Sequence, residues 1–285
     1  MILYISCRCK TIQIHIFYLV IATKHGTINF YLFLLEIMAK PENIYGLHTV
    51  HALLTHHPEH VLELFVLNSR EDERLQAIIQ LAKQFGLAVQ AVSREKLDQM
   101  AANSQHQGVV ARARSHTPLN ENDLAQLLKS LKEPAFLLVL DNITDPHNLG
   151  ACLRTAEAVG VHAVIAPRDK SAALTPVARK TASGAAEVLP FIQVTNLART
   201  LKQLADEGVW CVGTALTPEA KSIYDVDLKG SLAIVMGAEG AGMRRLTKEH
   251  CDTLTYIPMQ GSVQSLNVSV ATGIALYEAF RQRRG

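Results

Sequence analysis

The feature that most constrains the fold of this chain is a series of short apolar segments in its second half. They are AFLLVLD, VHAVIAP, LPFIQV, VWCVGTA and LAIVMGAE, at residues 135–141, 161–167, 189–194, 209–215 and 232–239. Strands that are apolar on both faces are typical of a parallel sheet covered by helices. Helical patterns lie between the segments, and the one at 196–208 ends in Gly208, which suits a helix C-terminus. The pattern therefore predicts an α/β domain with a parallel sheet over residues 133–285.

A smaller alternating pattern precedes this domain. We expect helices at 46–55 and 71–86, and strands at 62–67, 87–92 and 108–114. The second helix has an apolar stripe made of Leu75, Ile78, Ile79, Ala82 and Phe85. The pattern predicts a small α/β domain over residues 42–114, followed by a polar linker over 115–132.

The first 37 residues differ in composition from the rest of the chain. They hold six aromatic residues and a single acidic one, Glu36. Their apolar run from Ile12 to Ala22 is interrupted at Lys24, well short of the ~20 residues that a membrane-spanning helix needs. We therefore expect no membrane anchor, and we expect Met38 to be the natural start of the protein. The mass of the intact protein from its native host tests this expectation.

Charge and cysteine content narrow the environment of the protein. The formal net charge is only +2, so any polyanion must bind to local clusters of Lys and Arg. The five cysteines are an odd number and show no C-x-x-C spacing, which favours a reducing compartment over a disulfide framework. We expect a cytoplasmic protein.

Several common enzyme classes are excluded by missing motifs. The loop GAEGAG at 237–242 follows a late strand and lacks the G-x-G-x-x-G order of dinucleotide-binding proteins. The chain has no phosphate-binding G-x-x-x-x-G-K-[ST] loop, no G-x-S-x-G elbow and no H-E-x-x-H helix. Five histidines between His48 and His60 suggest a metal site, but no cysteine or carboxylate is placed to complete a tetrahedral set. We expect these histidines to be solvated and the protein to need no metal.

Three segments carry a family resemblance. LDNITDPHNLGACLRTAEAVG at 140–160, LAIVMGAEGAGM at 232–243 and IPMQGSVQSLNVSVATGIALYEA at 257–279 resemble, in order and spacing, the motifs of the SpoU (TrmH) family. This family, part of the SPOUT superfamily, comprises RNA ribose 2'-O-methyltransferases. The segments IYGLHTVHALL and HQGVVARA, at 44–54 and 106–113, resemble the RNA-binding domain of the members that methylate a guanosine of bacterial 23S rRNA.

The resemblance implies a fold, a reaction and partners. It implies a trefoil-knotted SPOUT catalytic domain, preceded by a ribosomal-protein-like RNA-binding domain, in a homodimer with active sites at the interface. The methyl donor would be S-adenosylmethionine (SAM), the product S-adenosylhomocysteine, and the substrate 23S rRNA, at its peptidyl-transferase loop, or a large-subunit assembly intermediate. Two alternatives are a transfer RNA guanosine 2'-O-methyltransferase and a non-catalytic RNA-binding assembly factor. The domain at 42–114 favours ribosomal RNA, and the presence of Arg154 and Asn267 favours catalysis.

The same resemblance assigns residues to the site. The cofactor would be held around Thr214, Gly237, Ile257 and Leu266. The reacting groups would be Asn148, Arg154, Glu239, Ser265 and Asn267. A guanidinium is hardly ever a base in proteins, so we expect Arg154 to bind the phosphate beside the target ribose and to stabilise the developing oxyanion. The alternatives are that Ile257 and Leu266 are ordinary core residues and that Glu239 is a carboxylate at a helix N-terminus.

Other residues are candidates for RNA contact and for dimer formation. The RNA candidates are His106 and Gln107 in an exposed-looking turn, and the basic residues Arg168, Lys170, Arg244 and Arg245. Further basic clusters are Arg179 with Lys180, and Arg281, Arg283 and Arg284. A stripe of small residues near the C-terminus suits close helix contact in a symmetric dimer and comprises Val268, Ala271, Ala275 and Ala279.

Overall fold

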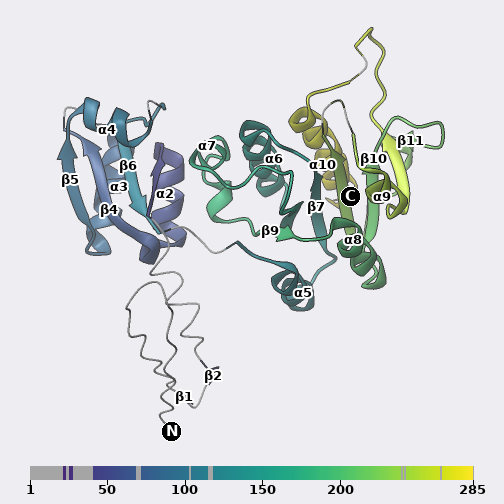
Figure 1. The fold of residues 1–285 in the computed structure, drawn as a ribbon, viewed down its shortest axis with the longest axis horizontal. Helices are drawn as coiled ribbons and strands as arrows, with labels where there is room; N and C mark the ends of the chain where they lie inside the picture. Colours follow the sequence, from purple (N-terminus) through teal and green to yellow (C-terminus); the bar gives the residue numbers. More distant parts are fainter. Residues whose placement is uncertain are drawn as a thin grey trace, which may run out of the picture. The chain divides into compact units, whose positions relative to one another are not determined.

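The computed structural model describes residues 22–23, 26–27, 41–68, 72–102, 104–114, 118–238, 240, 242–263 and 265–284 (Figure 1). The expected start at Met38 and the candidate residue Glu239 lie outside this described part. Strands β1 (Ala22–Thr23) and β2 (Gly26–Thr27) form an antiparallel pair. In the described part of the chain, no helix is both long enough and apolar enough to cross a membrane.

The second half of the chain contains a seven-stranded sheet in which every pairing is parallel. Its strands, in chain order, are β7 (Phe136–Asp141), β8 (Ala163–Pro167), β9 (Phe191–Val194), β10 (Trp210–Thr214), β11 (Lys221–Ser222), β12 (Leu232–Gly237) and β13 (Thr253–Tyr256). In space the order is β11-β13-β10-β12-β7-β8-β9. The predicted parallel sheet is confirmed, while β11 and β13 escape the sequence pattern because they carry no continuous apolar run. The trefoil knot stays a prediction, because strand order does not record how the chain is threaded.

Helices cover both faces of this sheet, as the apolar strands require. On one face, α6 (Pro146–Ala158), α7 (Pro176–Thr181) and α10 (Val268–Arg284) share a core with Leu138 and Leu140 of β7. On the other face, α5 (Glu121–Ser130) and α8 (Leu197–Asp206) pack on Leu137 and Val139. The short helix α9 (Arg245–Glu249) packs beside α8. A 3-10 turn, η2 (Ala185–Glu187), follows α7, and another, η3 (Ile223–Asp225), follows β11.

The smaller sheet is mixed rather than parallel. Its order is β3-β6-β4-β5, with β3 (Glu42–Tyr45), β4 (Val61–Leu67), β5 (Ala88–Val92) and β6 (Val109–Ala113). Strand β4 pairs parallel with β5 and antiparallel with β6. The helices α2 (Leu47–His56) and α3 (Glu73–Gln84) share one core cluster, and α4 (Arg94–Met100) belongs to a second. A 3-10 turn, η1 (Pro58–His60), precedes β4.

Two of the predicted apolar stripes differ from the structure. Leu75, Ile78 and Ala82 of α3 are buried as expected, but Phe85 is 48% exposed because it lies at the C-cap, where the chain leaves the helix. The small stripe of α10 is wrong as a surface for a second chain, because Val268, Ala275 and Ala279 are buried in this chain's own core. Ala271 packs against the same cluster. The apolar residues that α10 exposes are Val270 (51%) and Tyr277 (53%).

Candidate active site

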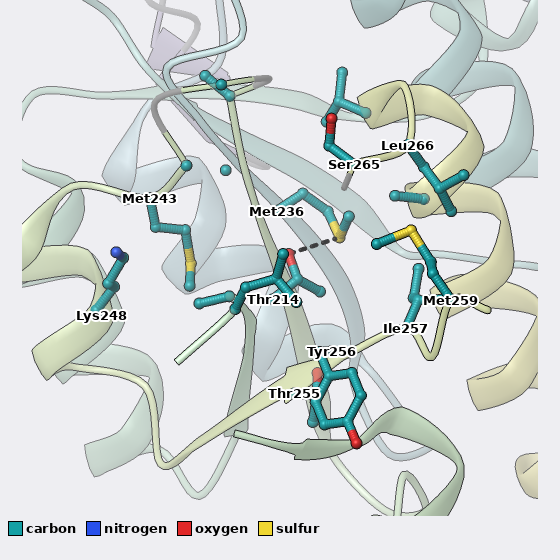
Figure 2. Close-up of a pocket in the computed structure, with 18 residues that line it drawn as sticks. Thr214, Met236, Met243, Lys248, Thr255, Tyr256, Ile257, Met259, Ser265 and Leu266 are labelled. Carbon is teal, nitrogen blue, oxygen red and sulfur yellow. Dashed lines mark hydrogen bonds between the residues drawn. The ribbon is translucent and has the colours of Figure 1, made fainter. Parts of the chain in front are cut away.

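A cleft of about 510 Å³ lies where β10, β12 and β13 end (Figure 2). All four residues predicted to hold a cofactor, and Ser265 with them, line it: Thr214, Gly237, Ile257, Ser265 and Leu266. Carboxyl ends of parallel strands are where open α/β sheets bind ligands. The structure therefore brings together residues that are up to 52 positions apart in the sequence, from Thr214 to Leu266.

The side chains around this cleft divide into two groups. Ile257, Met259 and Leu266 gather on one side of it, and Met243 and Lys248 lie on the other (Figure 2). Between them, the hydroxyl of Thr214 contacts Met236 Sδ at 3.6 Å and donates to the carbonyl of Val235 at 3.2 Å. Among the described lining residues, Lys248 is the single charged side chain. The cleft can therefore hold a flat apolar ring on one side and an anionic group at its opposite edge.

The glycine-rich loop after β12 forms one wall of the cleft by folding back on itself. The amide of Gly242 donates to the carbonyl of Ala238 at 2.8 Å. A Cβ placed on Gly237 would lie 2.3 Å from the amide nitrogen of Met243 and 2.4 Å from the carbonyl carbon of Gly242. Gly240 and Gly242 have φ angles of 77° and 65°, which disfavour other residues. The glycines thus permit a turn in which backbone, rather than side chains, faces a ligand.

Asn148 and Asn267 connect the first and third motif segments. Helix α6 begins at Pro146, with Asp145 as its N-cap, so Asn148 lies in the first helical turn. Its Oδ1 accepts a hydrogen bond of 3.0 Å from Nδ2 of Asn267. Oδ1 of Asn267 in turn accepts from the amide of Ser269 at 2.9 Å and from its hydroxyl at 2.6 Å. Asn267 therefore both caps the start of α10 and holds Asn148 beside the residues that line the cleft.

Two substitutions of Asn267 separate these two tasks. Asn267→Ala removes the cap and the bond to Asn148, so we expect it to lower the free energy of unfolding by about 1 kcal/mol. Asn267→Ser can still cap α10 but is too short to replace the amide that Asn148 accepts from. We expect the Ser variant to keep nearly all of the stability and to lose most of the methyl transfer that the family resemblance implies. Thermal unfolding and a turnover assay on both variants test this, and a fully active Ser variant would contradict it.

Arg154 lies apart from these residues. It is exposed on α6, it does not line the cleft, and no residue in the described ranges forms a hydrogen bond or ion pair with it. Arg154 therefore does not lie in this chain's own cleft, and the role that the resemblance assigns to it stays a prediction. A guanidinium without a partner among the described residues remains available to an external anion.

A second cleft, of about 480 Å³, contains three of the four predicted basic RNA contacts. Lys170, Arg244 and Arg245 line it, together with the N-terminal residues of α8. Arg168 is exposed nearby but is not part of the lining. This cleft lies at the carboxyl ends of β8 and β9. Its lining carries three basic residues against one acidic residue, Asp169, and of these Arg244 also pairs with Asp141 and Arg245 with Glu249. It suits a polyanion backbone better than a neutral ligand.

The other RNA candidates have structural partners. His106 is buried (6% exposed), which contradicts the expected exposed turn: its Nδ1 accepts from the amide of Gly108 at 3.0 Å, and its Nε2 lies 3.1 Å from Asp98 Oδ1. Gln107 is exposed, but its Oε1 accepts from the amide of Leu47 at 3.1 Å.

Basic residues of the remaining clusters also have partners within the chain. Arg179 is buried in a two-pronged ion pair with Glu187, at 2.8 and 2.9 Å. Arg281 pairs with Glu278, and the guanidinium of Arg283 lies 4.8 Å from the centre of the Phe136 ring. Among the described residues, no group of His, Cys, Asp and Glu could hold a metal ion, and His48, His51 and His56 are exposed.

The described cysteines are poorly suited to act as nucleophiles. Burial raises the pKa of Cys152 to about 11 and is the main cause that raises the pKa of Cys211 and of Cys251 to about 12. These thiols stay protonated at neutral pH, and the thiolate is the reactive form. The arrangement at the first cleft is one of backbone, hydroxyl and amide groups, which can bind and align two reactants.

Comparison with known proteins identifies the family. The model of the SpoU rRNA Methylase family matches residues 135–277, and the model for RNA 2'-O ribose methyltransferase substrate binding matches residues 43–119. The chain belongs to the SpoU rRNA methylase family. The resemblance of its three motif segments is thereby confirmed.

SpoU relatives of known activity match along nearly their whole length. The chain is 57% identical over 247 residues to the 23S rRNA (guanosine-2'-O-)-methyltransferase RlmB of Shewanella oneidensis, covering 87% of this chain and 100% of the relative. It is 55% identical over 242 residues to RlmB of Escherichia coli K12, covering 85% and 99%.

Solved SpoU structures share the fold. An RNA 2'-O ribose methyltransferase superposes with a TM-score of 0.72 at 25% identity, covering 88% of this chain and 92% of the other. The SpoU methyltransferase AviRb from Streptomyces viridochromogenes, in complex with AdoMet, superposes with a TM-score of 0.71 at 23% identity, covering 86% and 91%.

The sequence signals did not single out two residues of the SpoU domain, Asp141 and Lys248. Asp141 was detectable in principle, because it is a charged residue that ends an otherwise apolar strand.

Proposed function

We propose that this protein transfers the methyl group of SAM to the ribose 2'-hydroxyl of a guanosine in 23S rRNA. The observation that carries the proposal is the identity of 57% with a 23S rRNA guanosine-2'-O-methyltransferase over the whole length of that relative. The first cleft supports it, since the residues that the family resemblance assigns to the cofactor line one cavity. The other product would be S-adenosylhomocysteine.

The first cleft fits SAM by its shape and chemistry. The apolar side chains of Ile257 and Leu266 suit the adenine ring, and the missing side chain of Gly237 leaves backbone groups free to approach the ligand. Lys248 lies at the edge where a carboxylate would be neutralised. When bound, SAM supplies an electrophilic methyl group on a sulfonium.

The reacting residues act by alignment and electrostatics. Methyl transfer to a hydroxyl is an in-line displacement, so it depends on the mutual orientation of the two reactants and on removal of one proton. The Asn148–Asn267 pair and Ser265 offer hydrogen-bonding groups for the ribose beside the cleft. Arg154 would bind the neighbouring phosphate and stabilise the developing oxyanion, because its guanidinium remains protonated. Glu239 is assigned by resemblance to orient Arg154 or Asn148.

We propose a homodimer with its active sites at the interface. Two observations support this arrangement: Arg154 is exposed without a partner in the described chain, and the neighbouring helix α10 exposes the apolar residues Val270 and Tyr277. We propose that α10 packs against a second copy in such a way that Arg154 of one chain reaches the cleft of the other.

The dimer is tested by light scattering. We expect the protein at micromolar concentration to have twice the 31.3 kDa mass of one chain. Val270→Asp with Tyr277→Asp should give a monomer, because the change places charge in an apolar interface. Phe85→Asp is the matched control, since it adds a charge at an equally exposed aromatic residue elsewhere and should leave the dimer intact. A monomeric wild-type protein would rule out the arrangement.

We also propose the domain division 42–114, 115–132 and 133–285, and a cytoplasmic location. The first segment would bind the RNA substrate, and the second cleft would hold its phosphate backbone at Lys170, Arg244 and Arg245. The small domain would then recognise RNA by shape rather than by net charge.

One experiment separates the candidate functions. Ribose methylation is mapped in 23S rRNA and in transfer RNA from cells with and without the gene. Loss of one methylated guanosine in 23S rRNA supports the proposal, loss in transfer RNA supports the alternative substrate, and no loss in either supports a non-catalytic role. Complementation with Arg154→Lys then shows whether the methylation depends on this chain's own site.

A further inference from the structure

Asp141 is the most deeply buried acidic residue at the carboxyl ends of the strands, and the proposed mechanism leaves it unused. It ends β7, pairs in register with Gly237 of β12, and its side chain is 0% exposed. A carboxylate without water is costly unless charged or polar partners surround it. Its partners therefore indicate what the buried charge is for.

Both carboxylate oxygens of Asp141 bind a single residue, Arg244. Oδ2 accepts from the backbone amide of Arg244 at 2.8 Å, and Oδ1 accepts from its Nε at 2.6 Å and lies 2.5 Å from Nη2. Arg244 directly follows Met243, the last residue of the glycine-rich loop that walls the first cleft. The other end of this loop, Gly237, is fixed by the sheet beside Asp141. One buried carboxylate thus holds the two ends of the loop together.

We propose that Asp141 is a positioning residue that holds the 238–243 loop, through Arg244, in the arrangement that binds the cofactor. The inference rests on the proposed function, because it takes the first cleft to be the SAM site. Asp141 does not line that cleft, so it acts on the ligand only through the loop. The loop's own closure is a backbone hydrogen bond from Gly242 to Ala238. Its polar link to strand β7 is the Asp141–Arg244 ion pair, beside the packing of Met243 in the core cluster of Leu137 and Val139.

The expected consequence is a loss of SAM affinity out of proportion to any loss of stability. If the loop adopts its binding arrangement only a tenth of the time without the ion pair, the apparent dissociation constant rises about tenfold. Asp141→Asn keeps the size of the side chain but removes its charge and one acceptor. We expect this variant to bind SAM about tenfold more weakly by calorimetry. RNA is absent from that measurement, so any RNA contact of Arg244 does not enter it.

A matched control is available in the same domain. Glu187 is also a fully buried carboxylate held by two hydrogen bonds from one arginine, Arg179, but neither residue lines the first cleft. Glu187→Gln should lower the melting temperature about as much as Asp141→Asn and leave SAM affinity unchanged. Arg244→Lys, which keeps a charge that can reach one carboxylate oxygen, should bind SAM better than Arg244→Ala.

Amide hydrogen exchange gives a second readout that needs no ligand. In Asp141→Asn, exchange should rise in a peptide covering residues 236–246, which contains the bonded amides of Gly242 and Arg244, and not in the rest of the domain. The inference is overturned if Asp141→Asn binds SAM as wild type does, or if Glu187→Gln weakens SAM equally. If Asp141→Asn does not fold, the inference is tested by the SAM affinities of the two Arg244 variants, and equal affinity of Arg244→Lys and Arg244→Ala overturns it. Failure of the wild-type protein to bind SAM would count against the proposed function instead, and the exchange pattern would still test the positioning role.

Discussion

Arg154→Lys is expected to lower the rate of methyl transfer by about a hundredfold or more while SAM affinity stays close to that of the wild type. Lysine keeps the charge but loses the planar fork of donors that matches a phosphate or an oxyanion. Replacing an arginine that is merely solvated on a helix surface would change the free energy by less than about 0.5 kcal/mol. The rate of methyl transfer therefore distinguishes a reacting arginine from a solvated one. Arg154 does not line the first cleft, which is why its loss should leave the cofactor bound.

The measurement combines three assays on the same variant. Tritium-methyl transfer to ribosomal RNA reports turnover, calorimetry reports SAM affinity, and light scattering reports the oligomeric state. Arg199→Lys is the control, because Arg199 is also an exposed helical arginine (60% exposed) and lines neither cleft. Turnover close to wild type in Arg154→Lys would show that charge alone suffices, and the role assigned to the guanidinium would have to be abandoned.

The second large effect is expected at Gly237. Gly237→Ala places a methyl group 2.3 Å from the amide nitrogen of Met243 and 2.4 Å from the carbonyl carbon of Gly242, and neither backbone atom can yield without moving the loop. We expect SAM binding to fall by a factor on the order of a hundred or more, because the displaced loop no longer forms the wall of the cleft.

Gly261→Ala is the matched control for this substitution. No atom of the described residues lies within 4 Å of a Cβ built on Gly261, and its backbone is not in the left-handed region. This variant should bind SAM as wild type does and melt at nearly the same temperature. Calorimetry and thermal unfolding of both variants test the argument, which fails if Gly237→Ala retains wild-type affinity.

Much of the fold was predictable because the signal is local. Strands β7, β8, β9, β10 and β12 were predicted from their apolar runs, because a strand that is buried on both faces carries few polar side chains. Helix α8 and its terminal glycine follow from spacing alone. Strand β11, with Lys221 and Ser222, carries no such signal, because a two-residue edge strand is defined by its partner β13 and not by its own residues.

The candidate site was predictable by resemblance more than by physics. Thr214, Gly237, Ile257 and Leu266 line one cleft, yet nothing in their separate positions requires them to meet. Arg154 shows the opposite case, because the resemblance assigns it to the same reacting groups as Asn148, yet it does not line the first cleft of this chain. The sequence pattern placed His106 in an exposed turn beside Gln107, whereas its ring is buried and hydrogen-bonded to Asp98 and Gly108.

The sequence by itself determined the parallel arrangement of five strands, the alternation of strands with helices and the family of the chain, because these depend on periodicity and on contiguous motifs. Only the tertiary structure decided which charges are structural and which are free. Asp141, Arg179 and Glu187 are buried and paired, while Arg154 is exposed and unpaired among the described residues. The physical reason is that the cost of a buried charge depends on partners that are distant in sequence: 103 residues separate Asp141 from Arg244. Likewise, the small residues of α10 would form the same stripe on a dimer surface or in the core of one chain. Only the packing of α10 against α6 shows that they lie in the core.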